Sequence, residues 1–245
     1  MADKNRNNYK NEYRYLIEAE DCPFAITEGY KSLATNISFA IPQKENGMAK
    51  KIGIVSSISS EGKTTVSCNL AIAFAASGAK TLIIDCDLRK HDVLRYMKLK
   101  TKLGIMSYLS ENYTVEDVIL RNVLPNLDVL GCEKSAPNPA GLLSSNRFAN
   151  LLKMLESNYD YIIIDMPPLG LVSDAMRVAS KCDGCAVVVR SMSTTHKMLM
   201  QSISALEFGG CNILGFILKD SVESVKEYKK RYSYYSYYGQ DKQTK

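Results

Sequence analysis

The chain has 245 residues, of which 46% are hydrophobic and 23% are charged, and its formal net charge is +5. This length and composition predict a globular domain with a substantial core, and the charge is too small to indicate a nucleic-acid partner. No apolar run approaches the roughly 20 residues that a membrane span requires. Any role at a membrane is therefore expected to come from a partner, with no nucleic acid involved.

The seven cysteines are expected to be reduced thiols. The first residues are polar throughout and do not resemble a secretory signal, which predicts a cytoplasmic protein. Cys182 and Cys185 form a CxxC pair, but a structural zinc site needs about four ligands. No second CxxC exists, and the two histidines are far away in the sequence. We interpret the pair as small buried residues near the start of a strand.

The first segment, residues 1–48, is expected to combine a polar stretch with one helix. Residues 25–40 place Ile26, Tyr30, Leu33 and Ile37 on one helical face. Residues 42–50 interrupt this pattern with proline and glycine and are predicted to be a linker.

Residues 49–220 are predicted to form one α/β domain, because short apolar runs alternate with helical patterns. Such strands are typical of a mostly parallel sheet with helices on both faces. Beyond residue 220 the pattern stops, and residues 221–245 are expected to be a disordered, tyrosine-rich tail. The predicted strands are 51–57, 81–87, 127–131, 159–167, 184–190 and 212–218, and the predicted helices are 64–77, 141–157, 172–180 and 194–210.

A phosphate-binding loop is predicted between the first of these strands and the helix that follows it. The sequence SSISSEGKTT (56–65) contains a GKT core, although the strict pattern has glycine where Ser57 stands. Such a loop needs inward-facing N–H groups, a lysine for the phosphates and a hydroxyl for Mg²⁺. The expected ATP-binding residues are Ser59, Ser60, Glu61, Gly62, Lys63, Thr64 and Thr65.

Three aspartates are predicted to lie at the same edge of the sheet. Asp85 and Asp87 end the run LIIDCD, and Asp165 ends the run YIIID. In open α/β sheets ligands bind at the carboxyl ends of the strands. Carboxylates beside phosphates repel one another unless a metal ion or a transferable proton is present. The sequence therefore predicts a site that binds ATP and Mg²⁺ for phosphoryl transfer, in a fold of the P-loop NTPase type.

These motifs, over about residues 25–240, resemble the bacterial tyrosine kinases of capsule and exopolysaccharide biosynthesis. The resemblance is carried by EGKTT, LIIDCDLR, NPAGLLSSNRF (138–148), IIIDMPP and a terminal tyrosine cluster. It implies a P-loop kinase that autophosphorylates this cluster, in trans, and thereby regulates polysaccharide synthesis and export. The implied phosphoacceptors are Tyr228, Tyr232, Tyr234, Tyr235, Tyr237 and Tyr238.

The resemblance also implies roles for the site residues and a set of partners. Lys63 would bind the phosphates, and Thr64, Asp85 and Asp165 would hold Mg²⁺. Asp85 would contact the incoming tyrosine hydroxyl, with Asp87 assisting near the metal. The implied partners are the cytoplasmic end of a separate transmembrane modulator, a cognate tyrosine phosphatase and other copies of the chain. The modulator would recruit the kinase to the inner face of the cell membrane.

The sequence departs from the family pattern at three places. Met166 follows Asp165 where the family usually has serine or threonine. The helical E-x-x-R-x-x-R motif, which helps to assemble a ring of subunits, is matched only by Glu28 and Lys31, because the last position is Ala34. In NPAGLL, glycine stands where the family usually has an acid.

Two alternatives stay open from the sequence. A partitioning or division ATPase of the ParA/MinD kind would carry a signature lysine five residues before Lys63, and Ile58 stands there instead. A nucleotide-binding scaffold without catalysis would use its tail for docking alone.

Overall fold

The computed structural model describes residues 16–18, 22–44, 47–170 and 174–220. The predicted phosphoacceptor tyrosines all belong to residues 221–245 and lie outside the described residues, as do residues 171–173 of the predicted helix 172–180. No helix in the described ranges is both long enough and apolar enough to cross a membrane.

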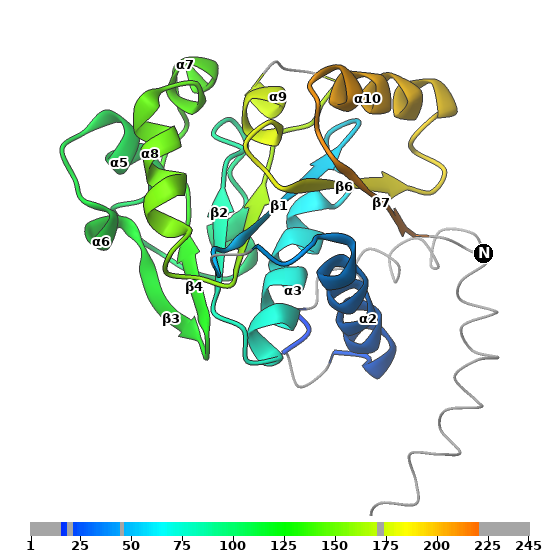
Figure 1. Cartoon of the computed structure of the whole chain (residues 1–245), viewed down its shortest axis with the longest axis horizontal. Helices are drawn as coiled ribbons and strands as arrows, with labels where there is room; N and C mark the ends of the chain where they lie inside the picture. Colours follow the sequence, from blue (N-terminus) through cyan, green and yellow to red (C-terminus); the bar gives the residue numbers. More distant parts are fainter. Residues whose placement is uncertain (1–15, 19–21, 45–46, 171–173, 221–245) are drawn as a thin grey trace, which may run out of the picture.

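A seven-stranded sheet with the order β3-β4-β2-β5-β1-β6-β7 forms the centre of the described structure (Figure 1). Every neighbouring pair is parallel except β3 and β4. The prediction of a mostly parallel α/β sheet is therefore confirmed. The strands are β1 Lys50–Ser56, β2 Thr81–Asp85, β3 Leu120–Leu124, β4 Leu127–Leu130, β5 Tyr161–Asp165, β6 Gly184–Arg190 and β7 Ile213–Lys219.

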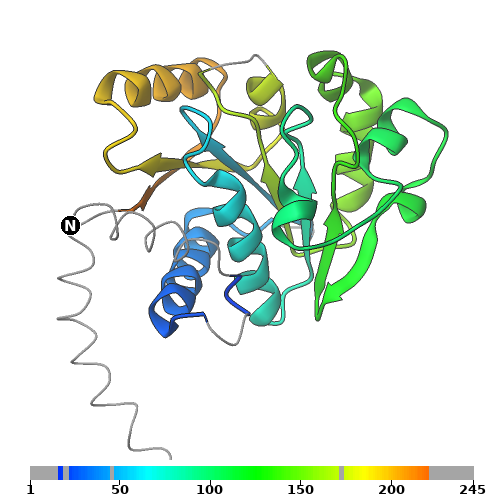
Figure 2. The same ribbon diagram turned by 180° about the vertical axis from the view of Figure 1, so that it is seen from behind.

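Helices cover both faces of this sheet, as Figures 1 and 2 show from opposite sides. Successive residues of a strand point to opposite faces. Ile83 and Ile163 accordingly pack with α2, α3 and α4, whereas Ile84 and Ile164 pack with α5 to α10. The helices are α2 Phe24–Ala40, α3 Lys63–Ala76, α4 Val93–Tyr96, α5 Ile105–Ser110, α6 Val115–Val118, α7 Pro139–Leu143, α8 Asn146–Leu155, α9 Asp174–Ala179 and α10 His196–Phe208.

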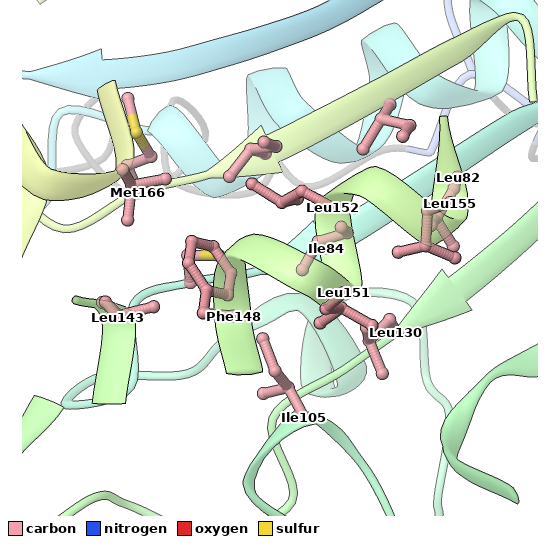
Figure 3. Packing of buried hydrophobic residues seen from close by; sticks show 14 of the residues in the cluster. Leu82, Ile84, Ile105, Leu130, Leu143, Phe148, Leu151, Leu152, Leu155 and Met166 are labelled. Atoms are coloured by element: carbon pink, nitrogen blue, oxygen red, sulfur yellow. The ribbon is translucent and has the colours of Figure 1, made fainter. Parts of the chain in front are cut away.

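Helix α8 supplies the largest side chain of the fully buried core. Its buried residues, Phe148, Leu151, Leu152 and Leu155, recur at helical spacing and therefore share one face. Figure 3 shows this face turned toward Ile84 of β2 and its neighbours. The helix begins where the Ser145 hydroxyl accepts a hydrogen bond from the N–H of Phe148 at 3.2 Å.

The single helix predicted over residues 141–157 is wrong in the structure. Two helices, α7 and α8, occupy this stretch because Ser145 caps a new helix start. Pro139 stands in the first turn of α7, and the Asn138 side chain caps it. Helices α4, α5 and α6 and the antiparallel strand β3 were not predicted, because elements of four to six residues show too little periodicity.

Replacing Phe148 by alanine is expected to lower the free energy of unfolding by about 3–5 kcal/mol, because the surrounding core cannot collapse onto the lost ring. Phe148→Leu should cost less, since it preserves most of the apolar volume. Urea unfolding followed by circular dichroism measures both. Equal, small losses for the two variants would show that this side chain is not an important part of the core.

Candidate active site

The loop between β1 and α3 has the backbone geometry of a phosphate-binding loop. Ser60 and Gly62 adopt left-handed conformations, with φ of 69° and 89°. Such reversals turn consecutive N–H groups toward one centre, which forms a concave anion site. Helix α3 starts directly after Gly62 and adds the partial positive charge of its N-terminus. The loop can therefore receive phosphate oxygens from backbone groups alone.

The Glu61 side chain holds this loop in place. It is 1% exposed, and its Oε2 atom accepts a hydrogen bond from the N–H of Ile58 at 3.0 Å. Its Oε1 atom accepts a hydrogen bond from the Thr194 hydroxyl, and Arg190 Nη1 donates to the Ser60 carbonyl at 3.3 Å. Both outside residues follow or end β6. The second half of the chain thus fixes the shape of a loop formed in the first half.

Lys63 and Thr64 lie against the predicted carboxylates. The distance from Lys63 Nζ to Asp87 Oδ2 is 3.0 Å and to Asp165 Oδ1 is 3.9 Å. Asp165 accepts hydrogen bonds from Thr64 Oγ1 at 2.7 Å and from Ser67 Oγ at 2.9 Å. Residues from β5, from the loop after β2 and from the first turn of α3 therefore meet at one point, at the carboxyl ends of the strands.

Asp85 completes this group from the neighbouring strand. It lies opposite Asp165 in the register of β2 and β5 and is fully buried. Its two oxygens accept hydrogen bonds from the N–H groups of Asp87 and Val93, each at 3.2 Å. Asp85 therefore fixes the loop that carries Asp87. The structure brings Lys63, Thr64, Asp85, Asp87 and Asp165 together, whereas the predicted phosphoacceptor tyrosines lie outside the described residues.

The electrostatics of this group are unbalanced. Burial and the Asp165 carboxylate raise the pKa of Asp85 well above its ordinary value. Burial also raises the pKa of Asp165, against the opposing effects of Lys63 and of the Thr64 hydrogen bond. Burial alone would lower the pKa of Lys63, but Asp165 and Asp87 outweigh it and the pKa is raised. One ammonium thus faces three carboxylates, and an added cation would relieve their repulsion.

These donors suit Mg²⁺ chemically. Carboxylate and hydroxyl oxygens are hard ligands, and Mg²⁺ in nucleotide sites usually takes one or two carboxylates together with phosphates and water. Within the described parts of the chain, no three His, Cys, Asp or Glu side chains are arranged to hold a metal by themselves. A site of this kind therefore fits a metal ion that arrives with the nucleotide phosphates.

Among the contributors to the site, Ser67, Asp174 and Lys219 were not expected from the sequence. Ser67 Oγ donates to Asp165, and Arg89 Nε donates to the buried Asp174 at 2.9 Å, which ties the loop after β2 to α9. The Lys219 side chain, at the end of β7, lies directly against Gly62, so any side chain there would displace it, and the φ of 89° already favours glycine. Only Ser67 had a usable signal, because it lies one helical turn after Lys63.

The departures from the family pattern have structural explanations. Met166 is fully buried and points into the core beside Gly53 and the sulfur atoms of Cys182 and Cys185. The hydroxyl partners of Asp165 come from α3, so residue 166 is not required for that purpose.

The residues at the E-x-x-R-x-x-R positions of α2 likewise make their contacts within the chain. Glu28 pairs with Lys31 along the same helix at 2.7 Å. Ala34 is 7% exposed and packs in the same core cluster as α3. A position that would carry an intersubunit arginine in the family is therefore an internal packing position in this chain.

Comparison with known proteins supplies the family. A family model described as an AAA domain matches residues 49–206. The tyrosine-protein kinase CpsD of Streptococcus agalactiae is 37% identical over 202 residues, which cover 82% of this chain and 86% of CpsD. The chain belongs to the bacterial tyrosine-protein kinases.

Solved structures agree with this assignment of the kinase. The chimerical protein CapA2B2 superposes with a TM-score of 0.76 at 34% identity, covering 83% of this chain and 88% of that one. The kinase domain of the Escherichia coli tyrosine kinase ETK has a TM-score of 0.73 at 32% identity, covering 79% and 74% of the two chains.

The ParA/MinD alternative corresponds to a more distant likeness. MinD from Pyrococcus horikoshii, solved with Mg-ADP, has a TM-score of 0.63 at 27% identity and covers 72% of each chain. This likeness confirms the P-loop NTPase type of the fold. It is weaker than the likeness to CapA2B2 and to the ETK kinase domain in both TM-score and identity.

Replacing Asp85 by asparagine is expected to remove a pH-dependent loss of stability from the nucleotide-free kinase while it impairs phosphoryl transfer. A buried carboxyl whose pKa is raised in the folded state destabilises the fold once the pH exceeds the ordinary pKa of 3.8. This loss of stability is complete at pH values above the folded-state pKa. Asparagine does not ionise, but its amide nitrogen would face one of the two N–H groups that donate to Asp85. The midpoint of thermal unfolding of Asp85→Asn, taken relative to wild type, should therefore rise by roughly 2–4 °C from acidic to neutral buffer.

Asp87→Asn is the matched comparison, measured by calorimetry without nucleotide. It removes the ion partner of Lys63 and should lower the midpoint. A difference in midpoint between Asp85→Asn and wild type that does not change with pH would contradict the charge imbalance described above.

Proposed function

We propose that this kinase transfers the γ-phosphoryl group of ATP to the tyrosines of its own C-terminal cluster, in trans between copies. The observation that carries the proposal is the meeting of Lys63, Thr64, Asp87 and Asp165 at the end of the phosphate-binding loop. Phosphoryl transfer depends on positioning and charge neutralisation, and this group supplies both. A scaffold without catalysis would not require three buried carboxylates beside one lysine.

The roles of the residues follow from their contacts. Lys63 is proposed to leave Asp87 for the phosphates, because their charge is greater than that of one carboxylate. Thr64, Asp85 and Asp165 are proposed to hold Mg²⁺, which would neutralise charge on the phosphate oxygens. The remaining predicted loop residues, Ser59, Ser60, Glu61, Gly62 and Thr65, are proposed to shape the phosphate cradle, with Glu61 acting through its hydrogen bonds.

The acceptor hydroxyl needs a base at neutral pH. A tyrosine phenol has a pKa of about 10 and therefore arrives protonated. The phenol oxygen forms a bond to the γ-phosphorus, the bond to the bridging oxygen of ADP breaks, and a carboxylate takes the proton. We assign this acceptor to Asp85 and the assisting position to Asp87, whose Oδ2 atom becomes available once Lys63 turns to the nucleotide.

The start of the tail supports its role as substrate. Arg190 donates from Nη1 to the Ser60 carbonyl and from Nε to Asp220 Oδ2 at 2.6 Å. The last described residue before the tail is therefore fastened to the phosphate-binding loop. We accordingly divide the chain into an N-terminal segment of residues 1–48, a kinase domain of residues 49–220 and a substrate tail of residues 221–245, which carries the acceptors between Tyr228 and Tyr238.

The partners are proposed on similar grounds. The cytoplasmic end of a membrane-spanning modulator is proposed to bind the kinase and recruit it to the inner face of the cell membrane, where it regulates capsule or exopolysaccharide synthesis and export. Two findings support this: the likeness to the CapA2B2 chimera, and a concentration of exposed apolar side chains late in the chain. These are Met192, Met198, Met200, Phe208, Phe216 and Leu218. A tyrosine phosphatase is proposed to reverse the reaction.

Transfer between copies is tested by mixing two full-length variants. One carries Lys63→Met with an intact tail, and the other has a wild-type site with all six tail tyrosines replaced by phenylalanine. Phosphotyrosine is expected on the Lys63→Met chain only when both are present with ATP and Mg²⁺. If wild type is phosphorylated but the mixture stays unmodified, transfer occurs within one copy. If wild type also stays unmodified even with the modulator fragment, the kinase proposal fails.

The metal role of Thr64 predicts a change in the Mg²⁺ requirement. Thr64→Ala should raise the Mg²⁺ concentration for half-maximal autophosphorylation by about tenfold or more, because an oxygen ligand is lost. Thr64→Ser keeps the hydroxyl and should behave nearly as wild type. A Mg²⁺ titration of initial rates measures this, and an unchanged requirement in Thr64→Ala would remove Thr64 from the metal site.

A further inference from the structure

A second pocket lies far from the phosphate-binding loop, between α5, α6, α8 and the edge strand β3. Its volume is about 910 Å³, within the range of ordinary ligand sites. Figure 1 shows α5, α6 and α8 together at the left, whereas β7 lies at the right. The polar side chains that matter here are Tyr113, Glu116, Arg121, Arg147, Asn150 and Lys153. We call this the Arg147 pocket.

Arg147 is held rigidly in this pocket. Its guanidinium lies over the Tyr108 ring at 4.8 Å, and its Nη2 atom donates to the carbonyls of Glu111 at 2.8 Å and Tyr113 at 3.2 Å. Its Nε atom is buried and has no hydrogen-bond partner within the described residues. A guanidinium held in this way keeps its positive charge at the pocket lining, where an anion can compensate it.

Two further cations line the same pocket. Arg121 is 45% exposed, and its Nη1 atom donates to Asp128 at 2.9 Å and to the Tyr159 hydroxyl at 2.7 Å, which fixes the orientation of the guanidinium. Lys153 is an exposed residue in the last turn of α8. Against these three basic residues the lining contains one acid, Glu116, so the lining residues alone carry a formal charge of 3 − 1 = +2. Asp128, behind the lining, compensates Arg121, so the positive charge offered to a ligand comes mainly from Arg147 and Lys153.

We propose that the Arg147 pocket binds a phosphotyrosine of the tail of a second copy of this chain. This inference rests on the proposed function, because that reaction generates the ligand. Arginine forks match phosphate oxygens geometrically, and clusters of arginine are a general means of phosphopeptide recognition. Tyr113 and Met154, which are 37% and 46% exposed, add apolar surface for the phenyl ring. Unmodified tyrosine lacks the charge that this lining requires.

Geometry favours a second copy over the chain's own tail. The tail begins after β7, and the pocket is at β3, which is the opposite edge of the sheet. Six strand spacings of about 4.8 Å separate these edges by about 29 Å. Tyr228 is eight residues beyond Asp220 and reaches that far only along a straight, fully extended path. As a flexible coil, eight residues span about 16 Å and the eighteen to Tyr238 about 23 Å. The average reach of the tail therefore falls short of the pocket on its own molecule, which only a more extended path from the later tyrosines would span.

The pocket would therefore separate substrate from product. An unmodified tyrosine is used at the phosphate-binding loop, whereas a phosphorylated one is retained at the opposite edge of a neighbouring molecule. Each copy offers one tail and one pocket, so the contact links copies in a directional way.

The test is peptide binding to full-length Lys63→Met protein, whose own tail stays unmodified. A fluorescent peptide of residues 228–242 with one phosphate at Tyr235 is titrated by anisotropy, beside the same peptide without phosphate. The phosphopeptide should bind at least tenfold more tightly. Lys153→Glu should weaken it at least fivefold, and Arg147→Lys should weaken it as well. Lys197→Glu, an equal charge change on the exposed face of α10, should leave the affinity unchanged.

Several outcomes would overturn this proposal. Equal affinity of the two peptides would do so, as would equal losses for Lys153→Glu and Lys197→Glu, which would indicate unspecific attraction. Displacement by Mg·ADP would place the peptide in the active site. Equal binding of a peptide with glutamate at 235 would assign the pocket to acidic segments of another protein. Because the peptide is synthetic, binding without kinase activity refutes only the proposed function, and activity without binding refutes only the pocket.

Discussion

The structure depends on a group of buried charges at the carboxyl ends of β2 and β5. Asp85 and Asp165 occupy opposite positions of adjacent strands, with Asp87 close by, and Lys63 is the only ammonium group that contacts them in the described structure. Burial of this kind is costly unless hydrogen bonds and countercharges compensate. The first turn of α3 and the loop after β2 contribute those bonds, so their conformations follow from the needs of the carboxylates. What they leave uncompensated is negative charge, which a cation bound with the nucleotide would neutralise.

The sequence predicted much of this arrangement, for physical reasons. The run GCAVVVR matches β6 residue for residue, because a strand buried on both faces is nearly continuous in apolar residues. The charged residues at strand ends were found because parallel strands deliver their carboxyl ends to one edge. Lys219 and Thr194 could not be found in this way. They reach the phosphate-binding loop through folding, across more than 120 residues of chain, and no spacing rule connects them to it.

Short helices could not be predicted from the sequence either. Helices α4 to α6 have four to six residues each, too few for an apolar period to repeat. Their positions are set by tertiary contacts, such as the Glu133 carboxylate that accepts hydrogen bonds from the N–H groups of Met106 and Ser107 at the start of α5. Helices α5 and α6 and strand β3 supply one side of the Arg147 pocket, and α8 supplies the other. A binding surface assembled from short pieces is therefore visible only once the chain is folded.

Arg190 connects the phosphate-binding loop to Asp220, the last described residue of the chain. Through one guanidinium it holds the carbonyl of Ser60 and the carboxylate of Asp220, the latter in a left-handed turn with φ of 58°. Lys219 presses against Gly62 from the same strand end. A displacement of Ser60 in the phosphate-binding loop would therefore also shift Asp220 at the end of the described chain. The phosphate-binding loop and Asp220 are thus connected through a single side chain.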